Sequence, residues 1–424
     1  MKITLKTSAG TFIRKYEGPI YLYEAIKDCG ITVPSDCGGR GVCGKCAVEA
    51  YGEMSPITDS EKLLLGEKEN FRLACMTKAV GDVQIIYNIN VKRMQVLAGG
   101  ISPDIKIKNV CGAGIAVAID IGTTTVAAAS YDLATGKRLD TYTYENPQRT
   151  HGADVVTRMD FASHGGLDTL KNEINGIINE IQSRSKAKEI IIAGNTAMLH
   201  FAAGLSTDRM SKAPFETESL FGYKIDGIYY APCASAYFGS DVVCGMAACE
   251  MDNNFPSFIA DIGTNGEMAV FDGGRYYCCS TAAGPCFEGY GIECGMPAVA
   301  GAVNRVFIDN GIPRYTVIDG EEPRGLCGSG LADYTACLLE LGIIDKTGYM
   351  SEKHCLCENV YITPRDVRNL QLAKAAIRAG IETLLDISGT KGKIKAFYLA
   401  GGMGNSIDIN SAVRLGLIPG EFAD

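Results

Sequence analysis

Alternating apolar and polar residues predict a small sheet at the beginning of this chain. KITLK and TFIRKY alternate with a period of two on either side of residues 8–10, which predicts a β-hairpin. YLYEAIKDC then predicts a short helix that ends at Gly30, and KCAVEAYGE, FRLACMT and DVQIIYN predict further strands. We therefore expect residues 1–95 to form a compact α+β domain with a long loop between its helix and its next strand.

Residues after 112 show the pattern of an α/β domain instead. The segment LDTLKNEINGIINEIQS predicts an amphipathic helix whose buried face is formed by Leu167, Leu170, Ile174, Ile177, Ile178 and Ile181. KEIIIAGN follows this helix as a buried strand. The preceding residues 96–112 contain Gly-Gly and Ser-Pro, so we expect a linker there and a second domain over residues 113–424.

An internal repeat divides this second domain. AIDIGTTTVAAA (118–129) and IADIGTNGEMAV (259–270) both place Asp-Ile-Gly-Thr between two apolar runs. The two aspartates, Asp120 and Asp261, are 141 residues apart. Two similar strand–turn–strand units at this spacing predict duplicated subdomains, at about 113–255 and 256–424, with one cleft between them.

Composition and charge narrow the class of protein. A formal net charge of −9 without a basic stripe argues against nucleic acid or an anionic membrane as a partner. The N-terminal MKITLKTSAGTF lacks the apolar core of a signal peptide, and the most apolar window, residues 112–129, contains Asp120 and threonines, which argues against a membrane span. Seventeen cysteines in a long chain without a secretion signal indicate reduced thiols and a metal centre in the cytoplasm.

The loop DCGGRGVCGKC matches three motifs. As a dinucleotide fingerprint, its glycines would have to lead into a helix, but the strand CAVEA follows them. As a phosphate-binding P-loop, it would need Ser or Thr after Lys45, where Cys46 stands. What remains is a set of thiolate ligands, Cys37-x5-Cys43-x2-Cys46, to which the predicted strand FRLACMT adds Cys75. Four thiolates are what a 2Fe-2S cluster requires.

Three glycine-containing turns predict a nucleotide site. In the first two, backbone N–H groups and hydroxyls could surround phosphate oxygens, while the preceding Asp120 or Asp261 holds Mg²⁺ or its water. The third, GGMG after the strand FYLA, would be a loop open enough for an adenosine. The residues concerned are Gly122, Thr123, Thr124 and Thr125 in the first turn, Gly263, Thr264, Asn265 and Gly266 in the second, and Gly401, Gly402 and Gly404 in the third.

These features resemble known families. The cysteine loop resembles the 2Fe-2S ferredoxins of β-grasp fold, and its five-residue gap is similar to the adrenodoxin-like branch. The three turns resemble the phosphate 1, phosphate 2 and adenosine motifs of the ASKHA superfamily of actin, sugar kinases and heat-shock chaperones. That resemblance implies two duplicated ribonuclease-H-like subdomains with a nucleotide cleft between them. With NPQRTHGADVVTRM, AGNTAMLH, CFEGYGIECGM and LCGSGLADYTACLL, nearly the whole chain resembles the reductive activators of corrinoid-dependent enzymes. Typical members are longer, so we expect this chain to lack their middle domain.

The resemblance implies a function and its participants. Members of this family use ATP to return an inactive cobalt(II) corrinoid protein to cobalt(I) by one-electron transfer. It implies that Asp120, Asp154 and Asp261 are catalytic, that Asn195 borders the nucleotide, and that the cofactors are a 2Fe-2S cluster, ATP and Mg²⁺. The expected partners are a corrinoid protein or another low-potential metalloenzyme and an electron donor such as a ferredoxin, and a homodimer is compatible with the resemblance. Two alternatives stay open: a small-molecule kinase with a ferredoxin redox sensor, in which Asp154 is the base, and a non-catalytic, nucleotide-gated iron–sulfur scaffold.

Overall fold

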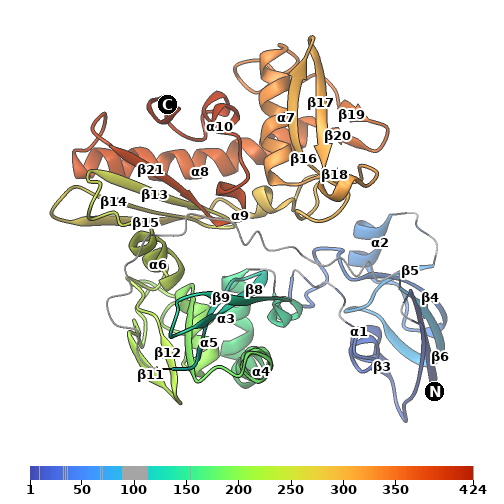
Figure 1. Ribbon diagram of the computed structural model, residues 1–424. Coiled ribbons are helices and arrows are strands. Elements are labelled where there is room, and N and C mark those ends of the chain that lie inside the picture. Colours follow the sequence, from blue (N-terminus) through green and yellow to red (C-terminus); the bar gives the residue numbers. More distant parts are fainter. Residues whose placement is uncertain are drawn as a thin grey trace.

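The computed structural model describes residues 1–87 and 113–423, apart from residues 9, 32, 34, 36, 67, 69 and 153. The linker expected at residues 96–112 lies outside the described residues. Figure 1 shows an N-terminal domain in blue beside two lobes, one coloured green and one coloured yellow to red. Helix α6 (Ser240–Ala248) lies between the two lobes and contacts the sheets of both.

The N-terminal domain is a mixed sheet covered by helices. Its strands run in the order β2-β1-β6-β4-β5, with β1 and β6 parallel and β3 paired to β6. Helix α1 buries Leu22 and Ile26 in the same cluster as Ile3 and Leu5 of β1. This arrangement confirms the expected β-grasp domain. The elements are β1 (Lys2–Thr7), β2 (Gly10–Lys15), β3 (Ile20–Tyr21), α1 (Leu22–Lys27), β4 (Ala47–Met54), α2 (Asp59–Leu65), β5 (Phe71–Leu73) and β6 (Lys78–Ile86).

The expectation that Cys75 lies on a strand is wrong. Strand β5 ends at Leu73, and the Met76 N–H donates to the Leu73 carbonyl over 2.9 Å to close a turn. The Ala74 N–H donates to the Cys46 carbonyl over 3.0 Å. FRLACMT is therefore a short strand followed by a turn, because its later N–H groups bond within the turn and to the cysteine loop.

A buried ion pair fixes helix α2 against this turn. The Glu61 side chain is 0% exposed and accepts hydrogen bonds from Arg72 Nε (2.9 Å), the Leu73 N–H (3.1 Å) and the Thr77 hydroxyl (2.8 Å). Burial acts to raise the pKa of Glu61, but Arg72 and the other donors lower it to about 2. The ion pair thus holds α2 and β5 together just before Cys75.

The first lobe is a six-stranded sheet in the order β11-β12-β10-β7-β8-β9. Strand β10 is parallel to β7, whereas β8 and β9 are antiparallel to their neighbours. Helix α4 confirms the predicted apolar face, because Leu170, Ile174, Ile178 and Ile181 are buried. The elements are β7 (Ile115–Ile121), β8 (Thr125–Asp132), β9 (Arg138–Glu145), η1 (Pro147–His151), α3 (Val155–Phe161), η2 (Ala162–Gly166), α4 (Leu167–Ser185), β10 (Glu189–Gly194), α5 (Thr196–Ala203), β11 (Tyr223–Ile225) and β12 (Ile228–Tyr230).

The second lobe repeats the central order of the first. Its sheet β21-β13-β14-β15 matches β10-β7-β8-β9, because in both a parallel strand flanks the aspartate-bearing strand and two antiparallel strands follow. This confirms the duplicated fold. The elements are β13 (Ser257–Ile262), β14 (Gly266–Phe271), β15 (Tyr276–Thr281), η3 (Pro285–Glu288), β16 (Ala302–Asp309), β17 (Ile312–Val317), η4 (Ile318–Gly320), β18 (Gly325–Leu326), α7 (Gly328–Glu340), β19 (His354–Cys357), β20 (Val360–Ile362), α8 (Pro364–Ser388), β21 (Ala396–Ala400), α9 (Gly401–Gly404), α10 (Ile409–Leu415) and η5 (Gly420–Phe422).

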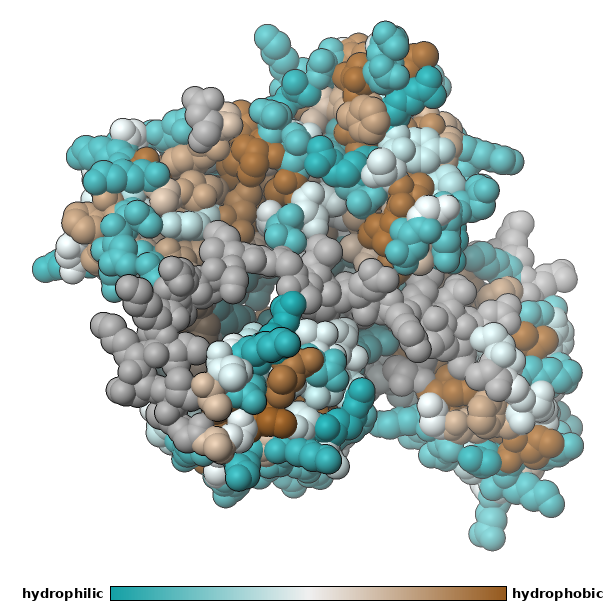
Figure 2. All heavy atoms as spheres, in the orientation of Figure 1, coloured by the Kyte–Doolittle hydropathy of each residue, from teal (hydrophilic) through white to brown (hydrophobic). Residues whose placement is uncertain are grey.

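Exposed apolar side chains are scattered in small groups over the surface. On the face shown in Figure 2, hydrophobic residues form separate small groups among hydrophilic ones. Val42, inside the cysteine loop, is 64% exposed, so this loop presents an apolar side chain to solvent. Within the described ranges, no helix is long and apolar enough to cross a membrane.

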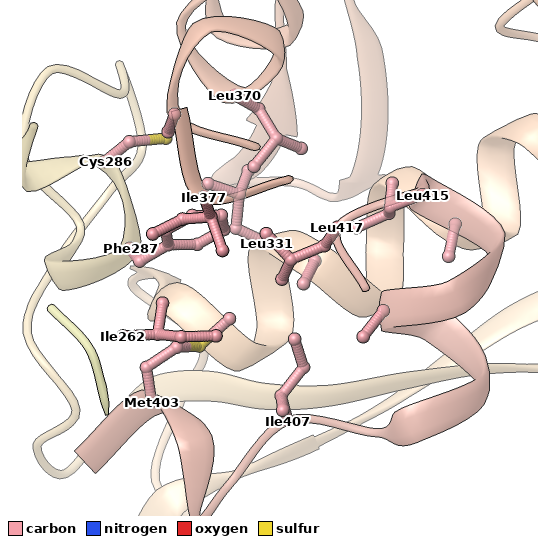
Figure 3. Packing of buried hydrophobic residues seen from close by; sticks show 14 of the residues in the cluster. Ile262, Cys286, Phe287, Leu331, Leu370, Ile377, Met403, Ile407, Leu415 and Leu417 are labelled. Carbon is pink, nitrogen blue, oxygen red and sulfur yellow. The ribbon is translucent and has the colours of Figure 1, made fainter. Parts of the chain in front are cut away.

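The core of the second lobe reaches the predicted nucleotide residues. Ile262, Phe287 and Met403 belong to one buried cluster and lie close to one another in Figure 3. Ile262 directly precedes Gly263, Phe287 directly precedes Glu288, and Met403 belongs to the third glycine turn. The same hydrophobic contacts therefore position three separate segments of the candidate site.

The third glycine turn differs from its expected form. It was predicted as an open loop after a buried strand, but it is the one-turn helix α9, and β21 before it is only half-buried. The Asn405 N–H donates to the Gly401 carbonyl over 3.1 Å, and the Met403 side chain is buried. Burial of Met403 explains why GGMG coils into a helical turn instead of remaining extended.

Candidate cluster and nucleotide sites

The four cysteines predicted as cluster ligands lie close together as two pairs. The Sγ atoms of Cys46 and Cys75 are 3.3 Å apart, and Cys37 and Cys43 lie close enough for each thiol to perturb the pKa of the other. In the part of the chain that the structure describes, no three His, Cys, Asp or Glu side chains converge as ligands of a single metal ion would. Paired thiols fit a 2Fe-2S cluster instead, because each of its two irons takes two protein ligands.

Hydrogen bonds within the loop favour thiolates, the form that binds iron. Burial acts to raise the pKa of Cys37, but N–H groups of residues 41–43 and the Cys43 thiol bond to its sulfur and lower the pKa. A hydrogen bond between the two thiols lowers the pKa of Cys46 to about 7 and raises that of Cys75. Burial raises the pKa of Cys43, so the loop favours the thiolate form at Cys37 and Cys46. The residues present therefore fit a negatively charged iron–sulfur group.

Two glycines are required by the shape of this loop. Gly41 has a φ of +69°, and a Cβ there would lie 2.6 Å from Met76 Sδ. Gly38 has a φ of +61°, and a Cβ there would lie 2.7 Å from the carbonyl oxygen of His151 in the first lobe. A side chain at either position would be both strained and too close to its neighbour. Gly38 thus lets the cysteine loop lie directly on the first lobe.

Charged side chains join the cysteine loop to both lobes. Arg40 Nε donates to the Cys37 carbonyl over 3.0 Å, and Arg40 Nη2 lies 3.5 Å from Thr157 Oγ1 of α3. Lys45 Nζ lies 5.9 Å from the ring centre of Tyr290 in the second lobe. The loop predicted to hold the cluster therefore contacts the two-lobed unit on both sides of the lobe junction.

Four carboxylates gather where the lobes meet, and we call them the acidic junction: Asp120 of β7, Asp241 of α6, Asp261 of β13 and Glu267 of β14. Burial and repulsion from Asp241 and Asp261 raise the pKa of Asp120 to about 7. Burial and repulsion from Asp241 and Glu288 do the same to Asp261. Burial raises the pKa values of Asp241 and Glu267 too.

Solvent reaches this acidic junction despite its position between the lobes. Many protein atoms surround the carboxylates of Asp120 and Asp261. Even so, part of each residue remains accessible to solvent: Asp120 is exposed and Asp261 is partly exposed. Water and salt therefore screen the repulsion, and its effect on stability is smaller than the pKa shifts alone suggest. The same access allows a ligand to enter.

The first two glycine turns face each other across the junction. The Gly122 N–H donates to the Thr125 carbonyl and the Gly263 N–H to the Asn265 carbonyl, each over 3.0 Å. Asn195 Nδ2 lies 3.4 Å from Thr123 Oγ1, so the predicted neighbour of the nucleotide does lie beside the first turn. Both aspartates and both turns are thus brought together.

A glutamate bridges the two turns. Glu288 Oε1 accepts from the Thr264 N–H (2.9 Å) and the Thr264 hydroxyl (2.5 Å). Its other oxygen, Oε2, accepts from the Thr124 hydroxyl over 3.3 Å. A carboxylate therefore already occupies an anion position made by residues of both lobes.

The remaining predicted residues are the third glycine turn and Asp154. Gly401 has a φ of +78°, and a Cβ there would lie 2.2 Å from Asp261 Oδ1, so the third turn lies against the acidic junction. Asp154 caps helix α3 by accepting from the Thr157 N–H over 2.7 Å. Its catalytic role stays a prediction.

Sequence reasoning assigned no role to three acidic residues that lie in the acidic junction or at the two turns beside it. Glu267 had a signal, because it is a charged residue in the otherwise apolar strand GEMAVF. Glu288 lies within the quoted CFEGYG stretch, but nothing local indicates that it reaches Thr124. Asp241 lies in the first turn of helix α6, outside both glycine turns, and only the packing of α6 between the lobes brings it there.

The chain consists of a ferredoxin-like domain followed by a duplicated ASKHA fold. These two parts define its class: an iron–sulfur protein that also has a fold typical of nucleotide-binding proteins. Residues 13–80 match the 2Fe-2S iron–sulfur cluster binding domain. Residues 115–254 match the RACo middle region, and residues 256–424 match the C-terminal domain of RACo, the ASKHA domain. The chain belongs to the RACo family. The expectation that it lacks the middle domain is wrong, because the first lobe is that region.

Relatives of known activity share most of this chain. The corrinoid activation enzyme RamQ of Eubacterium limosum is 31% identical over 356 residues, which are 72% of this chain and 60% of RamQ. A Co(II) methylated amine-specific corrinoid protein reductase of Methanosarcina barkeri is 28% identical over 356 residues, which are 72% of this chain and 66% of that protein. The chain thus spans about two thirds or less of the length of these curated relatives.

A solved structure has the same fold over nearly all of this chain. It is a reductive activator for corrinoid, iron–sulfur protein, with a TM-score of 0.63 and 24% sequence identity. The match covers 98% of this chain and 89% of that one. The ferredoxin-like domain and both lobes therefore occur together in that protein as well.

Proposed function

We propose that this protein is an ATP-dependent reductase that returns the cobalt(II) of a corrinoid protein to cobalt(I). The observation that carries this proposal is the contact of the cysteine loop with both lobes of the ASKHA unit, through Arg40 and Lys45. The matched relatives, a corrinoid activation enzyme and a cobalt(II) corrinoid protein reductase, support the choice of partner.

Cys37, Cys43, Cys46 and Cys75 are the proposed ligands of the cluster. A bound 2Fe-2S cluster supplies storage for one electron, which a donor such as a ferredoxin would provide. The chain holds the two thiol pairs and directs N–H groups of residues 41–43 at the Cys37 sulfur. The exposed Val42 gives a partner an apolar contact at the same loop.

Mg-ATP is the proposed ligand of the acidic junction. No three described side chains converge on one metal ion, but Mg²⁺ is usually held by only one or two carboxylates together with substrate phosphates and waters. Asp120 and Asp261 come from different lobes, and the turns after them offer N–H and hydroxyl donors for phosphates. A magnesium nucleotide bound here would favour one arrangement of the lobes over another.

Coupling between nucleotide binding and the cluster could supply part of the free energy that electron transfer to the partner requires. A coupling free energy of about 1–3 kcal/mol corresponds to about 40–130 mV for one electron. Ferredoxin clusters of the plant type lie near about −400 mV. Nucleotide-driven rearrangement can therefore shift a transfer that is marginally uphill, and a larger gap would need ATP hydrolysis.

An anaerobic reduction experiment tests the proposal. Reduced protein is mixed with cobalt(II) corrinoid proteins, and cobalt(I) absorbance is followed with Mg-ATP, with Mg-ADP and without nucleotide. We expect the fastest and most complete reduction with Mg-ATP. Equal cobalt(I) yields in all three mixtures would contradict the proposal. ADP formation that depends on a small acceptor would indicate the kinase, and absence of ATP turnover would indicate the scaffold.

A further inference from the structure

We propose that Glu288 occupies a phosphate position of the nucleotide site, and that its displacement by a nucleotide is transmitted through Tyr290 to the cysteine loop. The inference rests on the proposed nucleotide site and adds to it a residue that controls binding. It also gives a route from nucleotide to cluster.

The hydrogen bonds of Glu288 are those that a phosphate would need. Its carboxylate accepts from the Thr264 N–H, the Thr264 hydroxyl and the Thr124 hydroxyl, which are donors from both phosphate turns. Carboxylate and phosphate are both anions that accept several hydrogen bonds. They cannot both use these donors, so a phosphate entering here must displace the Glu288 side chain.

The backbone around Glu288 ties its movement to that of Tyr290. Cys286 and Phe287 are buried in the core of the second lobe. Gly289 has a φ of +82°, and a Cβ there would lie 2.3 Å from the Met296 carbonyl oxygen, so its backbone is tightly packed. Only this one packed residue separates Glu288 from Tyr290. Glu288 and Tyr290 therefore lie on one packed segment of the second lobe. Loss of the Glu288–Thr124 hydrogen bond, which joins the lobes, would let this segment, and Tyr290 with it, shift relative to the first lobe.

Tyr290 contacts both the first lobe and the cysteine loop. Arg149 Nη2 donates to the Tyr290 hydroxyl over 2.6 Å, and Lys45 Nζ lies 5.9 Å from the centre of its ring. Lys45 stands between two proposed ligands, and its backbone N–H bonds to the Cys43 sulfur. Hydrogen bonds to ligand sulfurs tune the potential of a cluster. Movement of Tyr290 would thus alter the environment of the cluster.

The first measurement is anaerobic binding of the non-hydrolysable analogue AMP-PNP with Mg²⁺ to the holoprotein. Glu288→Gln removes the competing charge but keeps the shape, so we expect roughly three- to tenfold tighter binding. The matched control Glu293→Gln changes an exposed carboxylate of the same segment and should bind as the wild type does. Equal or weaker binding by Glu288→Gln would overturn the proposal.

The second measurement is the electron paramagnetic resonance spectrum of the reduced cluster with and without the analogue. We expect the analogue to shift the spectrum of the wild type and of Glu293→Gln. Tyr290→Leu should bind the analogue normally but lose the shift, whereas Tyr290→Phe, which keeps the ring over Lys45, should retain part of it. A full shift in Tyr290→Leu would exclude the route through this ring.

The outcomes separate this inference from the proposed function. If Asp261→Asn weakens analogue binding but Glu288→Gln does not tighten it, the nucleotide site stands and the role of Glu288 fails. If the Glu288 and Tyr290 effects appear but no corrinoid protein is reduced, the route stands and the proposed function fails. Equal analogue binding by Asp261→Asn and the wild type would exclude both.

Discussion

Replacing Asp261 with Asn should stabilise the protein while abolishing its ATP turnover. In the folded chain, burial and the neighbouring Asp241 and Glu288 raise the pKa of Asp261 from 3.8 to about 7. An acid with a raised pKa binds its proton more tightly when folded than when unfolded. Its charge therefore lowers stability as the pH rises above 3.8, and the full loss is reached above about pH 7.

The magnitude follows from this shift and from the exposure of the side chain. About three pKa units correspond to about 4 kcal/mol. Asp261 is partly exposed, and screening by solvent reduces the effect to about 2 kcal/mol. At pH 5, only about one unit above the unfolded pKa, the expected gain is below about 1 kcal/mol. At pH 8 a gain of about 2 kcal/mol should raise Tm by about 4–8 °C.

Thermal unfolding at two pH values measures this effect. The chain contains no Trp, so unfolding is best followed by far-UV circular dichroism, at low salt and without nucleotide. Asp309→Asn, which removes an exposed carboxylate of the same lobe, serves as the control and should change Tm little at either pH. A gain in Asp261→Asn that is equal at pH 5 and pH 8, or a loss at pH 8, would refute repulsion within the acidic junction.

Three further changes test other parts of the molecule. Protein prepared anaerobically should contain about two irons and two sulfides, and should give a rhombic electron paramagnetic resonance signal after one-electron reduction. The variant Cys75→Ala should lose the cluster. Four irons, or an intact cluster in the variant, would contradict the assignment. Asp120→Ala should abolish ATP turnover but leave the cluster absorbance intact, because the two sites lie in separate units; an unchanged rate would place the nucleotide elsewhere. Glu61→Gln should destabilise the N-terminal domain by about 2–3 kcal/mol, because Arg72 stays buried without its charged partner. Loss of cluster absorbance at the wild-type temperature on heating would show that this ion pair contributes little.

Local patterns were sufficient for the parts whose chemistry lies in one short segment. The spacing of Cys37, Cys43 and Cys46 indicates a cluster loop. Cysteines this close together in a glycine-containing loop can all reach one small cluster, around which the backbone folds closely. The repeated Asp-Ile-Gly-Thr predicts two equivalent hairpins, and the structure has them in β7–β8 and β13–β14. In both cases the apolar runs that form the strands stand next to the polar residues that they position.

Tertiary structure alone decided which distant segments meet. The sequence determined the cysteine loop, the two Asp-Ile-Gly-Thr turns and the duplicated α/β pattern. It did not reveal the pairing of Cys46 with Cys75, the approach of Asp241 to the two turns, or the bridge made by Glu288. It also suggested an open loop at residues 401–404, where burial of Met403 produces a helical turn. The physical reason is the same in each case: backbone preferences act over a few residues, whereas these contacts depend on how separate hydrophobic surfaces pack together.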